Sequence, residues 1–461
     1  MEHLYEQRNK IILAFLVAAF IGIFNETALN MAFVELGRDF DKTTSTIQWL
    51  TTGYLLTLGI LVPVSAYLMQ RFTTRQLFTA SLIFSITGIV IAAISPTFTV
   101  LLVGRIIQAI GTAIILPLMM TVILLVYPIN KRGAAMGKIG LVIVFAPAIG
   151  PTVAGFVMER LTWHWIFWIS LPFLIAALLI GLKFIQNVSE IKPIKFDLLS
   201  FILSTIGFGG IVYGFSISGE LGTFMTSEVM VTIAVGVVAL VLFVIRQIKL
   251  EQPMLNLRVF RYPMYVVGLI ILLVGMMTIL STMVLLPIYL QNILLLAPVF
   301  AGLVLLPGGI ANAFMSVVAG NLFDKFGPTK IVPTGLVIII ASLNVLRTID
   351  EGTSPYLIVA LHVIMFVGIS LVMMPAQTNG LNQLPKELYP DGTAVMNTLQ
   401  QVSGAIGTAI AVTIMSITSA NAGNPTDGMI EGVQNSITFG MIISIIAFVI
   451  AIFMKNVREK A

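Results

Sequence analysis

The sequence predicts an all-α integral membrane protein with fourteen transmembrane helices, and three observations lead to this fold class. Of the 461 residues, 58% are hydrophobic and only 10% are charged, whereas soluble proteins carry about 25% charged residues. The mean hydropathy is +1.03. Apolar runs of about 20 residues, long enough to cross a bilayer as helices, recur along the whole chain. A soluble fold of this length could not bury so much apolar surface, so we expect a lipid bilayer as the solvent.

Fourteen apolar runs follow one another from the N-terminus to the C-terminus. They cover residues 11–34, 46–69, 76–95, 98–127, 134–158, 163–184, 197–217, 228–247, 264–290, 298–322, 329–347, 356–378, 391–417 and 436–454. The first run is too long for a signal-peptide core and no small-residue cleavage site follows it, so we expect it to be a retained helix. The ends of runs 197–217 and 264–290 are defined only to within several residues.

The positive charges predict the orientation in the membrane. With both termini in the cytoplasm, 20 of the 25 Lys and Arg residues fall on the cytoplasmic side and four on the outside, while Arg105 lies inside a span. Because cytoplasmic loops of membrane proteins carry an excess of Lys and Arg, this distribution favours cytoplasmic termini.

Two pairs of related stretches indicate an internal repeat. The stretch 66–78 (AYLMQRFTTRQLF) is similar to 320–332 (GNLFDKFGPTKIV), and 133–155 is similar to 392–412. This matches span 2 with span 10 and span 5 with span 13. We therefore predict a six-helix bundle at 1–187, a two-helix insert at 188–253 and a second six-helix bundle at 254–461. Repeated halves around a midplane site are typical of alternating-access transporters.

Several function classes are disfavoured by what the sequence lacks. It contains no cysteine and no GxxxxGK[ST] stretch, so we expect no thiolate metal site and no ATP cradle. We expect no metal, no cofactor and no nucleic acid partner, and an ion gradient as the energy source. Three scattered histidines do not form the cluster that an integral membrane enzyme requires. A channel is disfavoured because no filter-like loop is present.

Three motifs carry a resemblance to a known family. They are APAIGP at 146–151, GNLFDKFGPTK at 320–330 and LLVGRIIQAIG at 101–111. They resemble the helix 5, loop and helix 4 signatures of the major facilitator superfamily, and fourteen spans resemble its drug:proton antiporter branch. The resemblance implies the major facilitator fold. It also implies export of quinolones, dyes and other lipophilic, often cationic compounds across a bacterial cytoplasmic membrane, by a protein that we expect to be monomeric.

The proline and glycine residues of span 5 predict a bent, closely packed helix. Pro147 and Pro151 each remove a backbone hydrogen bond, and Gly150 and Gly155 allow another helix to approach closely. Such a helix is suited to rocking or to sealing a cavity. Ordinary packing of a kinked helix is the alternative explanation.

The loop motif after span 10 predicts a gate. Its turn residues are Gly320, Asp324, Gly327 and Pro328. Asp324 can cap the next helix or pair with a base, and so hold the cytoplasmic side closed in one state. The copy after span 2 has Gln70 where the family usually has an acid, so we expect a looser gate there. The alternative is a solvated basic turn that serves only topology.

Glu26 is the one acidic residue well inside a span. The antiporter branch usually reads Leu-Asp-x-Thr at this point, whereas this chain reads Phe24-Asn25-Glu26-Thr27. A shift of one residue turns a side chain by about 100° around a helix. The resemblance therefore leaves open whether Glu26 takes over the role of the family aspartate.

Glu26 and Arg105 lie at similar depth, each roughly 12 Å from the outer face at 1.5 Å per residue. They can interact directly or through Gln108. Desolvation favours the protonated carboxyl and a nearby arginine favours the ionised form, a balance that suits proton coupling. A fixed structural ion pair is the alternative.

Other polar residues on the spans are candidates for substrate binding together with Glu26. These candidates are Asn30, Trp49, Asn312 and Gln377. His362, at similar depth in span 12, titrates in a useful range but more often such a histidine only bonds a neighbouring helix. Numerous Met and Phe residues could line an adaptable cavity or simply face lipid.

We therefore predict a secondary active multidrug exporter that exchanges protons for lipophilic drugs and dyes. The alternative is a proton- or Na⁺-coupled transporter of one specific small solute. A cavity for a sugar or peptide would require more polar groups inside the spans than the sequence contains.

Overall fold

The structure is a computed structural model that describes residues 2–42, 44–188, 191 and 195–457, and all regular secondary structure in these residues is helical. The helices are α1 (Glu2–Ala28), η1 (Leu29–Ala32), α2 (Phe33–Asp39), α3 (Thr44–Arg71), α4 (Thr74–Ala93), α5 (Phe98–Val126), η2 (Ile129–Lys131), α6 (Arg132–Met158), α7 (His164–Phe184), α8 (Leu198–Leu221), α9 (Ser227–Lys249), η3 (Leu257–Arg261), α10 (Pro263–Asn292), α11 (Pro298–Phe326), α12 (Pro328–Leu346), α13 (Pro355–Asn382), η4 (Lys386–Leu388), α14 (Tyr389–Asn421) and α15 (Pro425–Ile452).

The predicted number of spans is confirmed, because the described residues contain fourteen helical segments long and apolar enough to cross a membrane. The largest difference in boundaries concerns the last span, which begins at Pro425 rather than at residue 436. Asn424 caps this helix by accepting a hydrogen bond from the Thr426 amide, and proline suits the first helical position. The helix thus starts in a polar segment that hydropathy alone does not recognise.

The helices pack as two groups of six with one additional pair. In the first group α1 packs against α5, α6 and α7, and α4 packs against α5 and α7. In the second group α10 packs against α13, α14 and α15, and α12 packs against α13 and α15. The pair α8 and α9 contacts both groups through α8, which lies against α3 and α14. We call the groups the first half and the second half. The predicted unit boundaries at residues 187 and 253 stay an interpretation.

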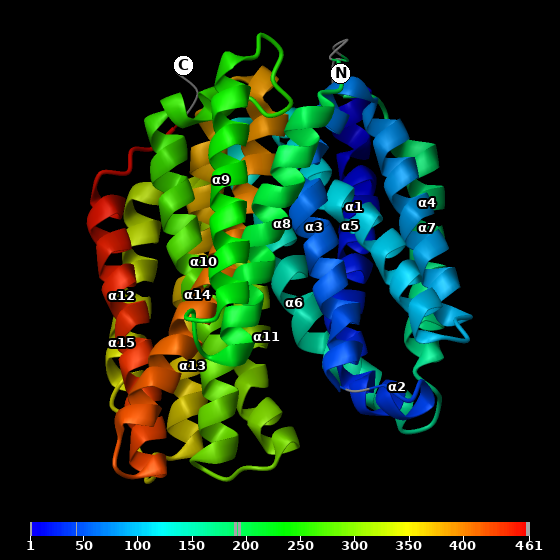
Figure 1. The fold of residues 1–461 in the computed structure, drawn as a ribbon. Coiled ribbons are helices and arrows are strands. Elements are labelled where there is room, and N and C mark those ends of the chain that lie inside the picture. The colour runs from blue at the N-terminus through cyan, green and yellow to red at the C-terminus, as the bar shows by residue number, and fades with distance from the viewer. Residues whose placement is uncertain (1, 43, 189–190, 192–194, 458–461) are drawn as a thin grey trace.

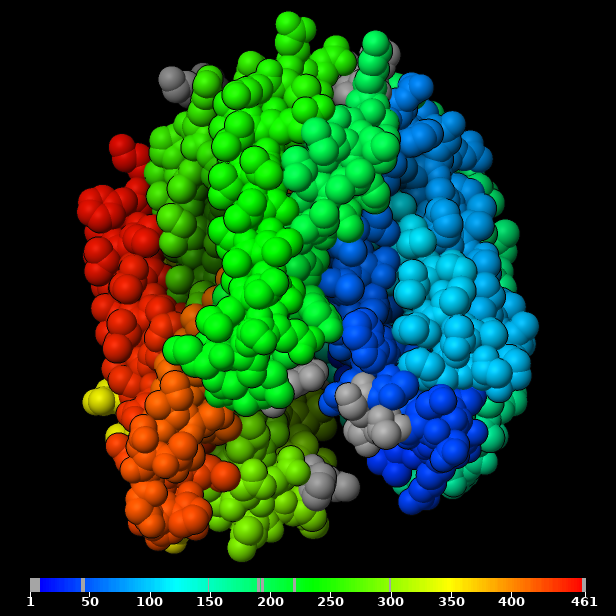
Figure 2. Space-filling model, in the orientation of Figure 1, coloured from blue at the N-terminus to red at the C-terminus, as the bar shows by residue number. Residues whose placement is uncertain are grey.

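The two halves are closed against each other at one end only. Both chain termini lie at this end, which we call the terminus side (Figure 1). Here α6 packs along α11, and α14 contacts α3 and α5 of the first half. At the opposite end, the far side, a notch separates the two halves (Figure 2). The structure therefore represents a state closed on the terminus side and parted on the far side.

Candidate functional site

Glu26 lies in α1 two residues before the helix changes to the 3₁₀ segment η1. Its side chain is half-buried, and the described residues provide no hydrogen-bond or ion-pair partner for its carboxylate. Asn30 is four residues further on and therefore projects from the same side of the helix. Asn30 is exposed. Glu26 and Asn30 are therefore less buried than Asn25, Ala28 and Leu29 on the same segment.

Arg105 of α5 is completely buried beside this site. Its Nη1 donates hydrogen bonds to the Asn25 carbonyl oxygen (3.0 Å) and to Gln108 Oε1 (2.9 Å). Its guanidinium carbon lies 4.3 Å from the centre of the Tyr54 ring. The Nε and Nη2 atoms have no partner among the described residues, so one edge of the guanidinium is available. The alternative considered from the sequence, a fixed ion pair between Arg105 and Glu26, is not among the contacts of the described residues.

Tyr54 and Thr112 complete the polar group around Arg105. The Tyr54 hydroxyl donates to Thr112 Oγ1 (2.8 Å) and lies 3.1 Å from the Gly22 carbonyl oxygen. These contacts join α1, α3 and α5 at Gly22, four residues before Glu26. Sequence reasoning missed both residues because a tyrosine and a threonine in an apolar helix carry no distinctive pattern.

Asn25 occupies the position of the usual family acid, but its side chain points away from Glu26. The Asn25 Nδ2 donates to Ser170 Oγ of α7 (2.9 Å) and to the Ile21 carbonyl oxygen (2.9 Å), and the residue is fully buried. Residue 25 therefore joins α1 to α7, whereas residue 26 has the partly exposed position on this helix.

Moving the acid back to position 25 should not restore function. In a Glu26→Gln background, we expect Asn25→Asp to leave dye efflux at the level of Glu26→Gln, because the new carboxylate would face α7. Efflux by the single and double variants in the same cells provides the measurement. Recovery in the double variant would show that the side chain at 25 reaches the transport pathway.

The prolines and one glycine of α6 pack around the same part of α1. A Cβ atom at Gly150 would lie 2.5 Å from Thr27 Oγ1 and 3.2 Å from the Phe24 carbonyl oxygen. Pro151 cannot donate to the carbonyl of Pro147, and the Thr27 hydroxyl lies 3.5 Å from that oxygen. The predicted close approach at Gly150 is thus present, one residue from Glu26.

The same expectation for Gly155 is wrong. A Cβ atom there would meet only the end of the Met31 side chain, at 3.7 Å. This is an ordinary van der Waals distance, so Gly155 is not required for close packing in this state.

The first contact between the halves joins α6 to α11 and is formed by Gly133, Gly137, Gly320 and Asp324. A Cβ atom at Gly320 would lie 2.2 Å from the Gly133 carbonyl oxygen, and one at Gly137 would lie 2.6 Å from the Ser316 carbonyl oxygen. The Asp324 carboxylate accepts hydrogen bonds from the Gly133 and Ala134 amides, both at 2.8 Å. We call this set the glycine contact. Asp324 thus caps the helix of the other half rather than the next helix in its own half.

The second contact joins α3 to α14 through Gln70 and Asp391, and we call it the Asp391 contact. Gln70 Nε2 lies 3.3 Å and 3.2 Å from the two carboxylate oxygens of Asp391, which is 1% exposed. The acid missing at position 70 is therefore present on the opposite half, with the amide as donor. We expected a looser gate here because position 70 lacks an acid, and that stays a prediction; the structure adds that the carboxylate of this contact comes from Asp391, 321 residues along the chain.

The two contacts are related by the internal repeat. The glycine contact links the end of span 10 to the start of span 5, and the Asp391 contact links the end of span 2 to the start of span 13. The repeated Ala-Ile-Gly motif behaves in the same way. Gly150 lies against α1, and a Cβ atom at Gly407 would lie 2.7 Å from the Met277 Cα of α10, the first span of the second half. The repeat inferred from sequence thus has equivalent packing in both halves.

Other polar bonds reinforce the terminus side. Arg132 Nη1 donates to Asn382 Oδ1 (2.8 Å) and Tyr389 Oη (3.1 Å) of the second half, and the hydroxyls of Thr121 and Thr393 lie 2.9 Å apart. In the sequence, Arg132 is one of the positive charges that predict the orientation in the membrane. The fold shows that it also joins the halves.

The predicted substrate-binding residues are distributed over different surroundings. Asn30 Oδ1 accepts a hydrogen bond from Thr51 (2.8 Å), and the 40% exposed Trp49 lies 5.9 Å from the Tyr213 ring of α8. Asn312 is buried and accepts a hydrogen bond from Ser370. Gln377 is also buried, with its Nε2 3.5 Å from Met120 Sδ. The structure does not bring Asn312 and Gln377 to an open surface in this state, and the substrate role of all four stays a prediction.

His362 and Gly327 have packing roles here. A Cβ atom at Gly308 would lie 2.1 Å from His362 Nδ1, so the imidazole fills the space between α11 and α13 beside Phe366. Gly327 adopts a φ of +76° at the end of α11, a conformation that favours glycine. The described residues contain no group of three or more His, Cys, Asp or Glu that could hold a metal ion.

The fold and these contacts define the class of the protein. It is a polytopic membrane protein made of two repeated helical halves, with an acid and an arginine inside the first half and a closed contact at one end. This is the architecture of alternating-access carriers. Residues 15–408 match the family model of the Major Facilitator Superfamily, and the chain belongs to this superfamily of transporters.

Curated relatives are similar over nearly the whole chain. The lincomycin resistance protein LmrB of Listeria monocytogenes is 56% identical over 457 residues, covering 97% of both chains. The LmrB protein of Bacillus subtilis is 56% identical over 97% of this chain and 96% of its own. The multidrug export protein EmrB of Haemophilus influenzae is 25% identical over 86% of this chain and 78% of its own.

Solved structures support the fold. The human organic anion transporter MFSD10 aligns with a TM-score of 0.67 and 12% identity, over 96% of this chain and 99% of that one. The proton:xylose symporter XylE aligns with a TM-score of 0.62 and 14% identity, over 97% and 96% of the respective chains. The predicted major facilitator fold is confirmed.

Proposed function

We propose that this protein is a proton-driven exporter of lipophilic, often cationic drugs in a bacterial cytoplasmic membrane. Names of its relatives, lincomycin resistance protein and multidrug export protein, support drug export as the activity. The bias of Lys and Arg supports a cytoplasmic location for the terminus side. The structure then represents the outward-facing state, with the glycine contact and the Asp391 contact as the cytoplasmic gate.

The observation that carries this proposal is the carboxyl of Glu26, which has no partner among the described residues and lies near the fully buried Arg105. A carboxyl without a fixed partner can hold a proton or attract a cation, whereas one locked in an ion pair cannot exchange either. The Nε–Nη2 edge of Arg105, which has no partner in the part of the chain that the structure describes, offers a place for the ionised carboxylate, since a guanidinium edge matches a carboxylate in a two-bond geometry.

Proton and drug would then compete for one group. A proton taken up from outside neutralises Glu26 and releases a cationic drug, and loss of that proton to the cytoplasm prepares the site for the next drug. Pro147 and Gly150 pack against α1 next to Glu26, so bending of α6 provides a route from the occupancy of this site to the gate. No cofactor takes part in this cycle.

Everted membrane vesicles test the coupling. We expect an imposed gradient with an acidic lumen to drive uptake of ethidium and lincomycin, and a protonophore to abolish it. A Na⁺ gradient without a pH gradient should drive no uptake. Uptake driven by Na⁺ alone would contradict proton coupling.

The same vesicles separate a multidrug exporter from a transporter of one solute. The alternative is favoured by one observation: the relatives at 56% identity are named for a single antibiotic, lincomycin. We expect several dyes and antibiotics to compete with one another for uptake. Uptake of lincomycin with no competition from any other compound would favour the alternative.

A further inference from the structure

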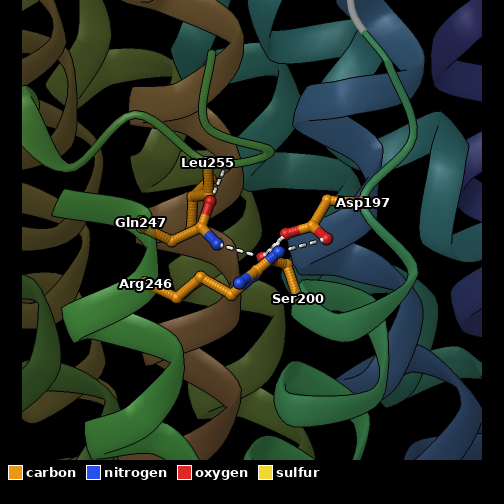
Figure 3. A network of polar contacts seen from close by, with 5 residues as sticks. All are labelled: Asp197, Ser200, Arg246, Gln247 and Leu255. Atoms are coloured by element: carbon orange, nitrogen blue, oxygen red, sulfur yellow. Dashed lines mark hydrogen bonds and ion pairs between the residues drawn. The ribbon is translucent and has the colours of Figure 1, made fainter. Parts of the chain in front are cut away.

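The inserted helices α8 and α9 are joined at their terminus-side ends by a polar cluster (Figure 3). Arg246, in the last turn of α9, donates from Nε to Asp197 Oδ2 (2.7 Å) and from Nη2 to Asp197 Oδ1 (2.9 Å). Ser200, in the first turn of α8, donates to the same carboxylate. These hydrogen bonds from Arg246 hold the pKa of Asp197 at about 2, below its ordinary value, so the pair stays ionised at neutral pH.

The cluster extends from the insert into the linker that follows it. Gln247 Nε2 donates to Ser200 Oγ (2.6 Å), and Gln247 Oε1 accepts the backbone N–H of Leu255 (3.1 Å). Gln247 and Leu255 are each 3% exposed. A buried amide that bonds a loop backbone in this way fixes the position of that loop, because leaving the buried groups unpaired is unfavourable.

The next residue of the linker reaches the gate. The backbone N–H of Asn256 donates to Asp391 Oδ1 (2.8 Å), the same carboxylate that Gln70 contacts from the first half. A chain of polar bonds therefore runs from the insert, through the linker, to the contact between the halves.

The insert is also in van der Waals contact with both halves. A Cβ atom at Gly59 of α3 would lie 3.6 Å from Val212 of α8, and one at Gly222, which ends α8, would lie 2.5 Å from Ser416 of α14. A helix pair that touches both halves is well placed to sense their relative position.

We propose that α8 and α9 are a positioning element of the cytoplasmic gate. Gln247 anchors the linker, so that Asn256 keeps its N–H on the Asp391 carboxylate. The insert thereby stabilises the outward-facing state through Asp391 rather than through contact with substrate. This role depends on neither the identity of the drug nor the coupling ion.

The sequence contains no cysteine, so a single introduced cysteine can report on the opening of the gate without background labelling. Thr121 is 2% exposed and bonds Thr393 across the gate, so a Thr121→Cys variant should react with a membrane-impermeant maleimide only when the cytoplasmic side opens. The reaction rate in everted vesicles, without drug or ion gradient, measures the population of the open state. A failure of the proposed drug export would leave this readout intact.

Two pairs of substitutions in the Thr121→Cys background test the connection. Gln247→Leu removes the anchor, and its control is Ile248→Leu on the adjacent, 69% exposed residue. Asn256→Pro removes the N–H, and proline suits the φ of −81° at this position. Its control is Asn256→Ala, which keeps the N–H and removes the side chain that caps η3.

We expect Gln247→Leu and Asn256→Pro each to raise the labelling rate by about tenfold, the effect of one lost hydrogen bond to a buried charge. Ile248→Leu and Asn256→Ala should be labelled at the same rate as the parent Thr121→Cys protein. The double variant Gln247→Leu/Asn256→Pro should be labelled no faster than the faster of the two single variants. Parent-rate labelling of both test variants, present in the membrane at parent levels, would overturn the proposal. Equal effects of Asn256→Ala and Asn256→Pro, or additive effects in the double variant, would also overturn it.

Discussion

Glu26→Gln should reduce ethidium efflux to the background of cells without the transporter, while the protein remains inserted in the membrane at normal levels. Glutamine keeps the size of the side chain but can neither exchange a proton nor attract a cation at neutral pH. The carboxylate has no partner among the described residues, so its loss leaves no buried base unpaired and the fold should persist. Efflux and membrane abundance measured in the same cells give the result.

Two variants serve as controls for this experiment. Glu35→Gln removes an acid from α2 at the far side of the same span and should leave efflux unchanged. Glu26→Asp keeps the charge on a shorter side chain and should retain part of the activity. Wild-type efflux by Glu26→Gln would remove this residue from the mechanism.

Gly320→Val should block transport by holding the two halves apart on the terminus side. The Cβ atom at this position would lie 2.2 Å from the Gly133 carbonyl oxygen and 3.2 Å from the Gly137 Cα. Both neighbours are backbone atoms, which cannot move aside as a flexible side chain can. Overpacking of this kind is unfavourable by about 1–3 kcal/mol, and here it acts only on the state in which the halves touch. The ratio of the state closed on the terminus side to the state open there should therefore fall by about tenfold to a hundredfold.

Gly302→Val on the same helix is the matched control, since a Cβ atom there would meet nothing within 4 Å. In Gly320→Val, drug efflux should fall and maleimide labelling of the Thr121→Cys reporter should rise. Gly302→Val should change neither. Normal efflux by Gly320→Val would show that the halves do not need to approach this closely during transport.

Most of the fold could be predicted from the sequence because a bilayer imposes length and hydropathy on each span. The repeat of residues 66–78 at 320–332 identified the two halves, and the packing of Gly150 and Gly407 on the first span of each half agrees with it. The start of the last helix was missed because its first residues, 425–435, are largely polar, and Asn424 caps them.

The candidate site was predictable in part. An acid inside an apolar span is conspicuous, so Glu26 and Arg105 could be found, and the depth calculation brought them to the same region. Their partners could not be found in the same way. Asn25 turns toward α7 and Arg105 bonds a backbone carbonyl, and such choices depend on the rotation of helices about their axes.

The contacts between the halves could not be predicted from single segments of the sequence. Gln70 taken alone indicates a missing charge, whereas the carboxylate that completes the contact belongs to Asp391 in the other half. Only the folded chain brings an amide at the end of one span to an acid at the start of another. The same applies to Arg132, whose partners Asn382 and Tyr389 lie in the second half.

Proton release on binding of a lipophilic cation is the most direct test of the competition at Glu26. Binding and protonation at one carboxyl are thermodynamically linked, so each must weaken the other. Tetraphenylphosphonium added to purified protein in weakly buffered detergent should acidify the solution, as followed with a pH-sensitive dye. The Glu26→Gln variant should release no protons. Saturable binding of the cation to the wild-type protein with no release of protons at any pH would contradict competition at this carboxyl.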